Sequence, residues 1–180
     1  MTTILIPLAT GFEEIEAVTL IDILRRANIK VITASLNDLD VTGANNITIK
    51  ADRYIQTITS DELDMILLPG GWGGTHILAD DIFVQDIIKE MDAKNKTIGA
   101  ICAAPFALDK AGVLKDKFTC YPSVEDEISN KNYTDSLKIV EDNNIITSQG
   151  PATAMEFGLY LVEKFAGIEK YKQLKVGLLA

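Results

Sequence analysis

The sequence predicts an α/β domain with a mostly parallel sheet and helices on both of its faces. Short apolar runs alternate with longer segments of helical spacing along the 180 residues, and hydrophobic residues make up 47% of the chain, enough for a real core. A β-α-β-α order is typical of parallel strands joined by helical crossovers. Because no linker or internal repeat interrupts this order, we expect a single domain over residues 1–180.

The first predicted elements alternate as this fold requires. Residues 4–8 form an apolar strand, residues 12–27 carry apolar side chains at helical spacing, and residues 31–34 form a second strand. Residues 47–49 and 54–58 alternate between apolar and polar side chains, which predicts a half-buried β-ribbon.

The middle of the chain predicts two central strands and two helices. Residues 65–68 form a buried type of strand that ends at a Pro-Gly-Gly turn, and residues 82–93 form an amphipathic helix. Residues 97–101 form another central strand, and residues 104–111 form a helix that Gly112 ends.

The last third of the chain begins with a short strand at residues 118–121. Residues 138–140 and 145–147 flank an Asp-Asn-Asn turn and predict a hairpin. A helix from Pro151 to about residue 165 follows, since proline is tolerated at a helix start. Residues 169–176 form a final helix.

Charge and composition exclude several function classes. The net charge of −9 and the absence of a basic stripe argue against nucleic-acid binding. No apolar stretch reaches transmembrane length, and no basic segment precedes the first apolar run, so we expect neither a membrane partner nor a signal peptide. The two cysteines lack metal-ligand spacing, and the single histidine cannot build a multi-histidine site, so we expect no metal. A cytoplasmic protein is the expectation.

The segment around Cys102 is the most informative part of the sequence. The apolar strand at residues 97–101 leads directly into Cys102, and Ala103, Ala104 and Pro105 open a helix. This order is typical of a nucleophile elbow. Backbone N–H groups at a helix start favour an anion, so we expect a lowered pKa for the thiol. The alternative is a small buried residue at a strand end.

A glycine-rich loop at residues 69–75 follows the strand at residues 65–68. Loops at the carboxyl ends of parallel strands line the ligand crevice. We therefore expect Gly70 and Trp72 at the pocket, with the N–H group of Gly71 facing Cys102 in an oxyanion hole. The alternative is an ordinary flexible turn. The loop matches neither the phosphate-binding nor the dinucleotide-binding pattern, and we expect no cofactor.

Three glutamates open the helix predicted at residues 12–27. The simplest interpretation is capping, because acidic side chains in a first turn suit the helix dipole. Glu16, however, lies above an apolar stripe, so its pKa should rise and it could exchange a proton with a thiolate. Glu13 shares a similar stripe, and spacing alone does not choose between them.

Four segments, in their order and spacing, resemble the ThiJ/PfpI superfamily, in the branch of the Parkinsonism-associated protein deglycase and its bacterial relatives. The resemblance covers nearly the whole chain. The segments are Phe12-Glu13-Glu14-Ile15-Glu16, Leu68-Pro69-Gly70-Gly71, Ala100-Ile101-Cys102-Ala103-Ala104-Pro105 and Ser148-Gln149-Gly150-Pro151.

The resemblance implies a flavodoxin-like three-layer sandwich with a small β-ribbon, assembled as a homodimer. It implies that Cys102 is the reactive cysteine and that Glu16 is the protonated carboxyl touching it. It also implies that the N–H group of Ala103 joins that of Gly71 in facing the cysteine.

Further pocket residues come from the same resemblance. It implies that Gly150 and Pro151 form a pocket-lining turn. Some members place a histidine before a proline at the pocket, where this chain has Tyr121, and we expect the Tyr121 ring to line the pocket instead. Peptidase-like members carry a histidine directly after the cysteine, where this chain has Ala103, so a peptidase is not expected.

Three more sequence features bear on the pocket. His76 is a candidate substitute base, although a loop residue usually faces solvent. Cys120 is either a resolving thiol for Cys102 or buried filler. Residues 43–46 lack the arginine that relatives carry in the β-ribbon, which predicts a lower affinity for anions.

The expected function is cysteine-dependent detoxification or repair of reactive carbonyls, of the glyoxalase or protein deglycase kind and linked to oxidative stress. Cys102 adds to the aldehyde of a small carbonyl or a glycated protein, and Glu16 shuttles the proton. The alternative is a redox-sensing or chaperone-like dimer with an oxidisable Cys102 and little turnover.

Overall fold

The computed structural model describes residues 1–180 and has a central sheet of seven strands in the order β5-β2-β1-β6-β7-β9-β8. All neighbouring strands are parallel except the pair β8 and β9. The strands are β1 (Thr3–Leu8), β2 (Lys30–Ser35), β5 (Arg53–Tyr54), β6 (Met65–Leu68), β7 (Thr97–Ile101), β8 (Ile139–Asp142) and β9 (Ile145–Ser148).

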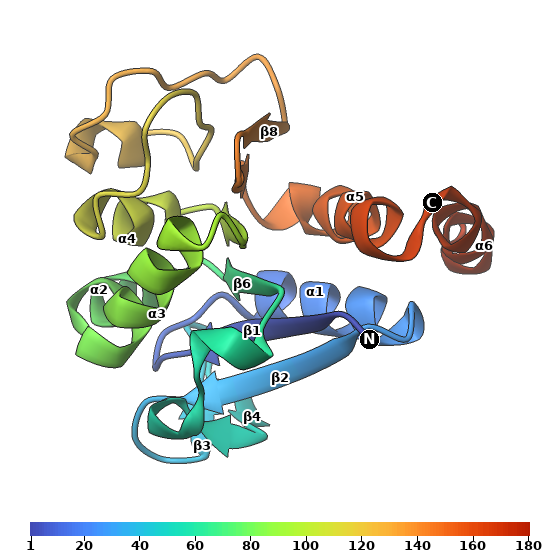
Figure 1. The fold of residues 1–180 in the computed structure, drawn as a ribbon, viewed down its shortest axis with the longest axis horizontal. Coiled ribbons are helices and arrows are strands. Elements are labelled where there is room, and N and C mark those ends of the chain that lie inside the picture. Colours follow the sequence, from blue (N-terminus) through green and yellow to red (C-terminus); the bar gives the residue numbers. More distant parts are fainter.

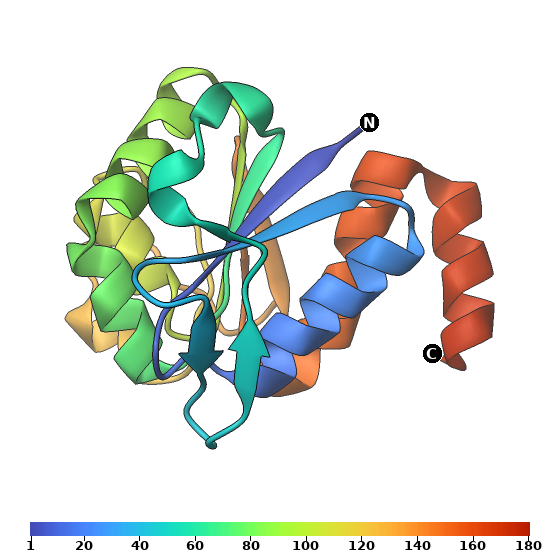
Figure 2. The same ribbon diagram turned by 90° about the horizontal axis from the view of Figure 1, so that it is seen from below.

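Helices cover both faces of this sheet, which confirms the predicted three-layer α/β sandwich. Figure 2 shows α1, α5 and α6 on one side of the sheet and α2 and α3 on the other. Strands β1 and β6 are buried along their whole length, because helices exclude water from both faces. The helices are α1 (Glu14–Arg26), α2 (Trp72–Asp80), α3 (Ile82–Ala93), α4 (Pro105–Lys110), α5 (Ala154–Ala166) and α6 (Ile168–Leu178).

The β-ribbon differs from the prediction in its pairing. β3 (Asp40–Thr42) pairs antiparallel with β4 (Thr48–Lys50), whereas residues 54–58 enter the edge strand β5 and the 3-10 turn η1 (Ile55–Thr57). The cause is Asp52, whose carboxylate accepts hydrogen bonds from the N–H and hydroxyl groups of Thr33. These bonds hold the following residues against β2, so they join the main sheet.

The segment at residues 118–121, predicted as a strand, forms only one bridge, between Phe118 and Tyr133. Its N–H groups are bonded elsewhere. Thr119 donates to the Thr147 hydroxyl at 2.9 Å, and Tyr121 donates to the carbonyl of Cys102 at 2.9 Å. The segment is therefore fixed beside the end of β7 without a strand ladder.

The glycine-rich segment forms more helix than expected, because α2 begins at Trp72. Gly71 has a φ of +87°, a conformation that glycine adopts without strain, and it turns the chain out of β6. A Cβ on Gly74 would lie 2.8 Å from the backbone nitrogen of Phe12. Glycine here lets the start of α2 pack directly on the loop before α1.

The C-terminal elements follow the prediction closely. The hairpin of β8 and β9 forms at the edge of the sheet, and Pro151 starts the 3-10 turn η4 (Pro151–Thr153), which leads into α5 (Figure 1). The last predicted helix is α6, packed on α5. None of the helices combines the length and the apolar character that a membrane crossing requires.

Candidate active site

Cys102 lies at the carboxyl end of β7, at a sharp turn of the backbone. Its φ is +64°, which is unusual for a residue with a side chain. Its N–H group donates to the carbonyl of Ser148, and its own carbonyl accepts from the N–H group of Tyr121, both at 2.9 Å. The helix α4 starts three residues later. The strand, the strained turn and the helix form the predicted elbow.

Gly70, at the end of β6, provides the space in which Cys102 and Glu16 meet. A Cβ on Gly70 would lie 2.6 Å from the Cβ of Cys102 and 2.6 Å from Oε2 of Glu16. Both side chains therefore occupy the space that any larger residue would fill. Gly70 lies beside the Cys102 and Glu16 side chains and is not among the residues that line the pocket.

Glu16 is the glutamate that the fold places beside the thiol. Its side chain is fully buried on α1, and Oε2 accepts a hydrogen bond of 2.7 Å from the N–H group of Gly70. Burial raises the pKa of Glu16 to about 7, and the charge of Glu13 adds to this, against the lowering effects of Cys102 and Gly70. Oε1 is buried without a hydrogen-bond partner, an arrangement that favours the protonated carboxyl.

The pKa of the Cys102 thiol is raised, not lowered as the sequence predicted. Burial is the largest cause, and the charge of Glu16 is the next, while hydrogen bonds from the N–H groups of Gly71 and Ala103 act in the opposite direction. The helix dipole is weak here because α4 has only six residues. The thiol and the carboxyl therefore compete for protons as one coupled pair.

An open cleft of about 490 Å³ leads to Cys102, which is 9% exposed. Of the predicted pocket residues, Trp72, Tyr121 and Pro151 line this cleft. Gly150 lies behind it, since a Cβ there would be 3.1 Å from the Tyr121 ring.

Three lining residues were not predicted from the sequence: Ser123, Val124 and Glu127. They belong to the turn around η3 (Val124–Glu127), which follows the Tyr121-Pro122 pair. The sequence did carry one signal for this turn, because the acidic residues at 125–127 closely follow Tyr121, a predicted pocket residue. The left-handed turn at Ser123, with a φ of +81°, had no sequence signal. Glu13, which spacing left as the alternative to Glu16, also lines the cleft.

Glu14, the middle glutamate of the motif, holds the β-ribbon. Its buried carboxylate accepts hydrogen bonds from the N–H groups of Asn45 at 2.6 Å and Ile47 at 3.3 Å. Burial acts to raise the pKa of Glu14, but hydrogen bonds, with that from the Asn45 side chain the largest, outweigh it and lower the pKa. The three glutamates therefore have different tasks: Glu13 lines the cleft, Glu14 anchors the ribbon and Glu16 meets the thiol.

His76 and Cys120 both lie outside the cleft lining. The His76 ring packs against Trp72 and Phe106, with centroid distances of 4.5 and 5.1 Å. Cys120 is fully buried, and its sulfur lies 3.9 Å from a carboxylate oxygen of Glu125. Burial and the Glu125 charge raise the pKa of Cys120 to about 12. No group of His, Cys, Asp or Glu side chains is arranged to hold a metal ion.

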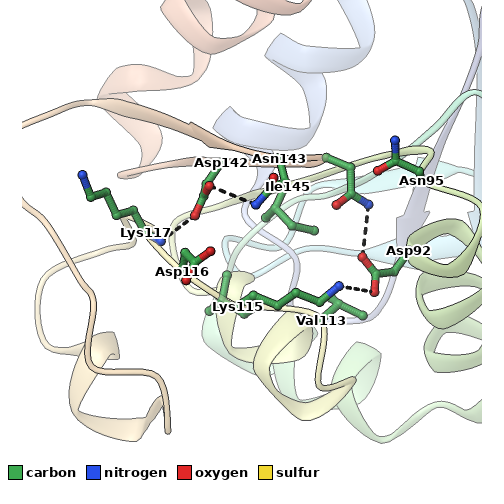
Figure 3. Close-up of a pocket in the computed structure, with 11 residues that line it drawn as sticks. Asp92, Asn95, Val113, Lys115, Asp116, Lys117, Asp142, Asn143 and Ile145 are labelled. Carbon is green, nitrogen blue, oxygen red and sulfur yellow. Dashed lines mark hydrogen bonds and ion pairs between the residues drawn. The ribbon is translucent and has the colours of Figure 1, made fainter.

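A second cleft, of about 320 Å³, lies at the amino-terminal ends of β7 and β9 (Figure 3). Its polar side chains bond to one another. Lys115 pairs with Asp92 at 2.8 Å, and Asp142 accepts from the N–H group of Lys117 at 2.8 Å. Asn144 donates to the other oxygen of Asp92 at 3.2 Å. These contacts hold neighbouring turns together, and no Cys, Ser, Thr or His side chain lines this cleft.

Comparisons with known proteins agree with this geometry. A sequence profile of the DJ-1/PfpI family matches residues 2–164. The crystal structure of Drosophila melanogaster DJ-1beta is similar with a TM-score of 0.95 and 40% identity, over 99% of this chain and 98% of that chain. The structure of oxidized Toxoplasma gondii DJ-1 has a TM-score of 0.93 and 34% identity, over 99% and 98%. The glutathione-independent glyoxalase DJR-1.2 of Caenorhabditis elegans is 33% identical, over 90% of this chain and 87% of that protein.

Proposed function

The chain belongs to the DJ-1/PfpI family, and from this premise we propose that it uses Cys102 to remove small reactive carbonyls or to repair proteins that carry them. The observation that carries the proposal is the fully buried Glu16 carboxyl beside the Cys102 thiol. A relative whose name describes a glutathione-independent glyoxalase supports the same chemistry.

The first step is addition of the sulfur to an aldehyde. With its proton on Glu16, the pair offers a thiolate, which attacks the aldehyde carbon of a 2-oxoaldehyde such as methylglyoxal. A C–S bond forms, and the carbonyl π electrons move to oxygen. The N–H groups of Gly71 and Ala103 stabilise the oxyanion, which takes the proton of Glu16 to give a hemithioacetal.

The second step moves a proton between carbons. The Glu16 carboxylate removes the proton from the carbon bonded to sulfur, and an enediolate forms with its charge on the neighbouring oxygen. The hydroxyl proton of the hemithioacetal passes to that oxygen, and Glu16 returns its own proton to the neighbouring carbon. The oxygen on the sulfur-bonded carbon becomes a carbonyl, which gives the thioester of a 2-hydroxy acid. Water hydrolyses the thioester, releasing the hydroxy acid and the thiol. A carboxyl with a pKa of about 7 is suited to both directions of this transfer.

Loss of methylglyoxal and formation of lactate, both followed in time, test this proposal. We expect Cys102→Ser to abolish turnover and Glu16→Gln to lower kcat by about a hundredfold or more, because general acid–base transfer is lost. Cys120→Ser is the matched control and should retain the native rate. Equal rates for the native protein and Cys102→Ser would remove the enzymatic proposal.

A redox-sensing or chaperone-like dimer is the second candidate, favoured by the absence of histidine from the cleft lining. Peroxide would transfer one oxygen to the Cys102 sulfur and leave as water or hydroxide. A second equivalent gives the sulfinate, to which a protonated Glu16 can donate a hydrogen bond. Mass spectrometry after mild peroxide treatment tests this. Oxidation of Cys120 or of methionines before Cys102 contradicts it.

We further propose that the protein is a homodimer that contacts its partner through the outer face of α1. The apolar side chains of Ile15, Val18 and Ile47 are exposed, and the N–H group of Ile47 is bonded to Glu14 at the start of α1. Light scattering of the purified protein measures the mass, and Val18→Glu should yield monomers. A monomeric native protein contradicts the proposal.

Both cysteines are free thiols, as suits the predicted cytoplasmic location.

A further inference from the structure

The cleft beside Cys102 combines negative charge with exposed aromatic rings. Its two charged residues, Glu13 and Glu127, are both acidic, and no Lys, Arg or His lines it. Trp72 and Tyr121 are 41% and 50% exposed and line the same cavity. The cleft therefore offers carboxylates and accessible π surfaces around a single thiol.

The carboxylates of Glu13 and Glu127 come from two elements that are far apart in the sequence. Glu13 is the residue that precedes α1, and Glu127 ends the turn η3. The same turn carries Glu125 and Asp126, which add to the negative field. Residues from two separate elements thus make the cleft lining acidic, whereas Cys102 is only 9% exposed and Glu16 is fully buried.

No basic side chain lines the cleft, and the arginines are engaged elsewhere in the fold. Each of the three arginines pairs with a carboxylate at 2.8 Å, at the far end of α1 or on the edge strand β5. Lys110, on α4, extends over the Phe106 ring at 5.2 Å and does not line the cleft. The acidic groups of the cleft therefore have no basic residue of this chain lining the cavity beside them.

We infer that this cleft selects carbonyl compounds that carry positive charge, with Glu13 and Glu127 as specificity-determining residues and the Trp72 and Tyr121 rings as their partners. The faces of Trp and Tyr attract cations, and carboxylates add Coulombic attraction. The substrate class is a small aldehyde or ketone that carries an ammonium or guanidinium group apart from its carbonyl. Anionic carbonyls, including 2-oxo acids, are disfavoured. This inference rests on the proposed function and names the substrate class of that site.

Charged thiol reagents of matched reactivity test the inference. Methanethiosulfonates carrying a trimethylammonium or a sulfonate group both form a mixed disulfide with a thiolate and release methanesulfinate. We expect the cationic reagent to modify Cys102 at least about tenfold faster than the anionic one, relative to their rates with a free thiol. Attraction of the cation and repulsion of the anion by the two lining carboxylates shift this ratio in the same direction.

Variants locate the source of the selection. Glu13→Gln and Glu127→Gln should each reduce the ratio of cationic to anionic rates several-fold, and the double variant should bring it near the free-thiol ratio. Glu163→Gln is the matched control, because it removes one exposed carboxylate on α5, outside the cleft lining. A ratio that is unchanged in the double variant, or that falls equally in Glu163→Gln, overturns the inference.

The only tryptophan of the chain, Trp72, provides a readout that does not depend on thiol reactivity. Quenching of its fluorescence by caesium and by iodide compares access of a cation and an anion to the cleft. We expect caesium to be favoured over iodide in the native protein, with the preference lost in the double glutamine variant and at high salt. Equal relative quenching in the native and double-variant proteins contradicts the inference.

The two proposals fail separately. Charge-selective modification and quenching without any loss of methylglyoxal would contradict the enzymatic proposal and leave the cleft selective for cations. Turnover of methylglyoxal without charge selection would contradict the specificity of the cleft and leave the enzymatic proposal standing.

Discussion

Cys102 and Glu16 titrate as a pair, because each lies in the electrostatic field of the other. The pair loses its first proton near pH 7. In that state it carries one negative charge, which can be placed on either oxygen or sulfur. The thiolate form is the one that reacts, and the N–H groups of Gly71 and Ala103 favour it. Reactivity thus depends on how one proton divides between two buried groups.

The pH dependence of Cys102 alkylation follows from this pairing. Iodoacetamide should react with a rate that rises through about pH 7 in the native protein, as the pair loses its first proton. In Glu16→Gln the carboxyl route for proton loss is gone, so the midpoint must move to higher pH. Rates measured on Cys120→Ser backgrounds exclude the second thiol. A midpoint that moves down in Glu16→Gln contradicts this pairing.

Gly70 is the residue on which the geometry of the pair depends. Gly70→Ala places a methyl group 2.6 Å from both partners, and overpacking of this kind costs about 1–3 kcal/mol of unfolding free energy. We expect turnover to fall sharply. Gly177→Ala, where a Cβ meets nothing within 4 Å, is the control and should be neutral or slightly stabilising. Urea unfolding measures the change in stability, and loss of methylglyoxal measures turnover. A Gly70→Ala variant that turns over methylglyoxal at the native rate would contradict this role of Gly70.

Much of this residue-level picture could be predicted from the sequence, but the pKa direction could not. The strand-turn-helix pattern around Cys102 and the glycine at position 70 are local signals. Burial of the thiol by distant elements is not local, and it outweighs the short helix α4. Spacing also left Glu13 and Glu16 equivalent, since only the packing of α1 against Gly70 separates them.

Among the elements, the β-ribbon is attached to α1 by one carboxylate. Glu14 bonds the turn between β3 and β4, and the N–H group of Ala44 also donates to the carbonyl of Phe12 at 2.8 Å. A Cβ on Gly43 would lie 2.4 Å from Oε1 of Glu14. The ribbon turn is therefore shaped around this side chain.

Removal of this anchor should free the ribbon without unfolding the sheet. Glu14→Ala leaves three part-buried N–H donors of Asn45 and Ile47 without their acceptor, and we expect a loss of about 1–3 kcal/mol of unfolding free energy. Hydrogen exchange of the amides at residues 43–48 should accelerate most. Glu163→Ala, at an exposed helix position, should change stability by less than about 0.5 kcal/mol. If hydrogen exchange at residues 43–48 is the same in Glu14→Ala and the native protein, Glu14 does not hold the ribbon in place.

Central strands were predictable from continuous apolar runs, and the ribbon pairing was not. The alternation at residues 54–58 fits a half-buried strand in either sheet. The hydrogen bonds from Thr33 of β2 to the Asp52 carboxylate decide that these residues join the central sheet. The start of α2 was missed because glycines usually weaken a helix. Here they are required by close packing on Phe12, a contact between segments about 60 residues apart in the chain, which no local pattern reports.

For the whole molecule, burial of Glu16 couples folding to pH. The pKa of Glu16 is raised from 4.5 in the unfolded chain to about 7 in the folded one. The folded state therefore binds more protons between these values. The stabilisation is fully present below pH 4.5 and is lost as the pH rises through 7.

The native protein should therefore lose about 3 kcal/mol more unfolding free energy than Glu16→Gln between about pH 4 and pH 8, which is the shift in pKa converted to energy. Subtraction of the two curves removes the contribution of the other titrating groups of this acidic chain. Urea titrations at several pH values supply the data. Parallel curves for the two proteins are the result that contradicts this expectation.

The two edges of the central sheet bear on how the molecule can assemble. One edge is the two-residue strand β5, and the other is the antiparallel strand β8, whose Glu141 is bonded to Lys164 of α5 at 2.7 Å. Short and charged margins resist strand addition by a neighbouring chain. The margins of the central sheet thus steer copies of this protein away from fibre-like stacking, and they direct association toward other surfaces of the molecule.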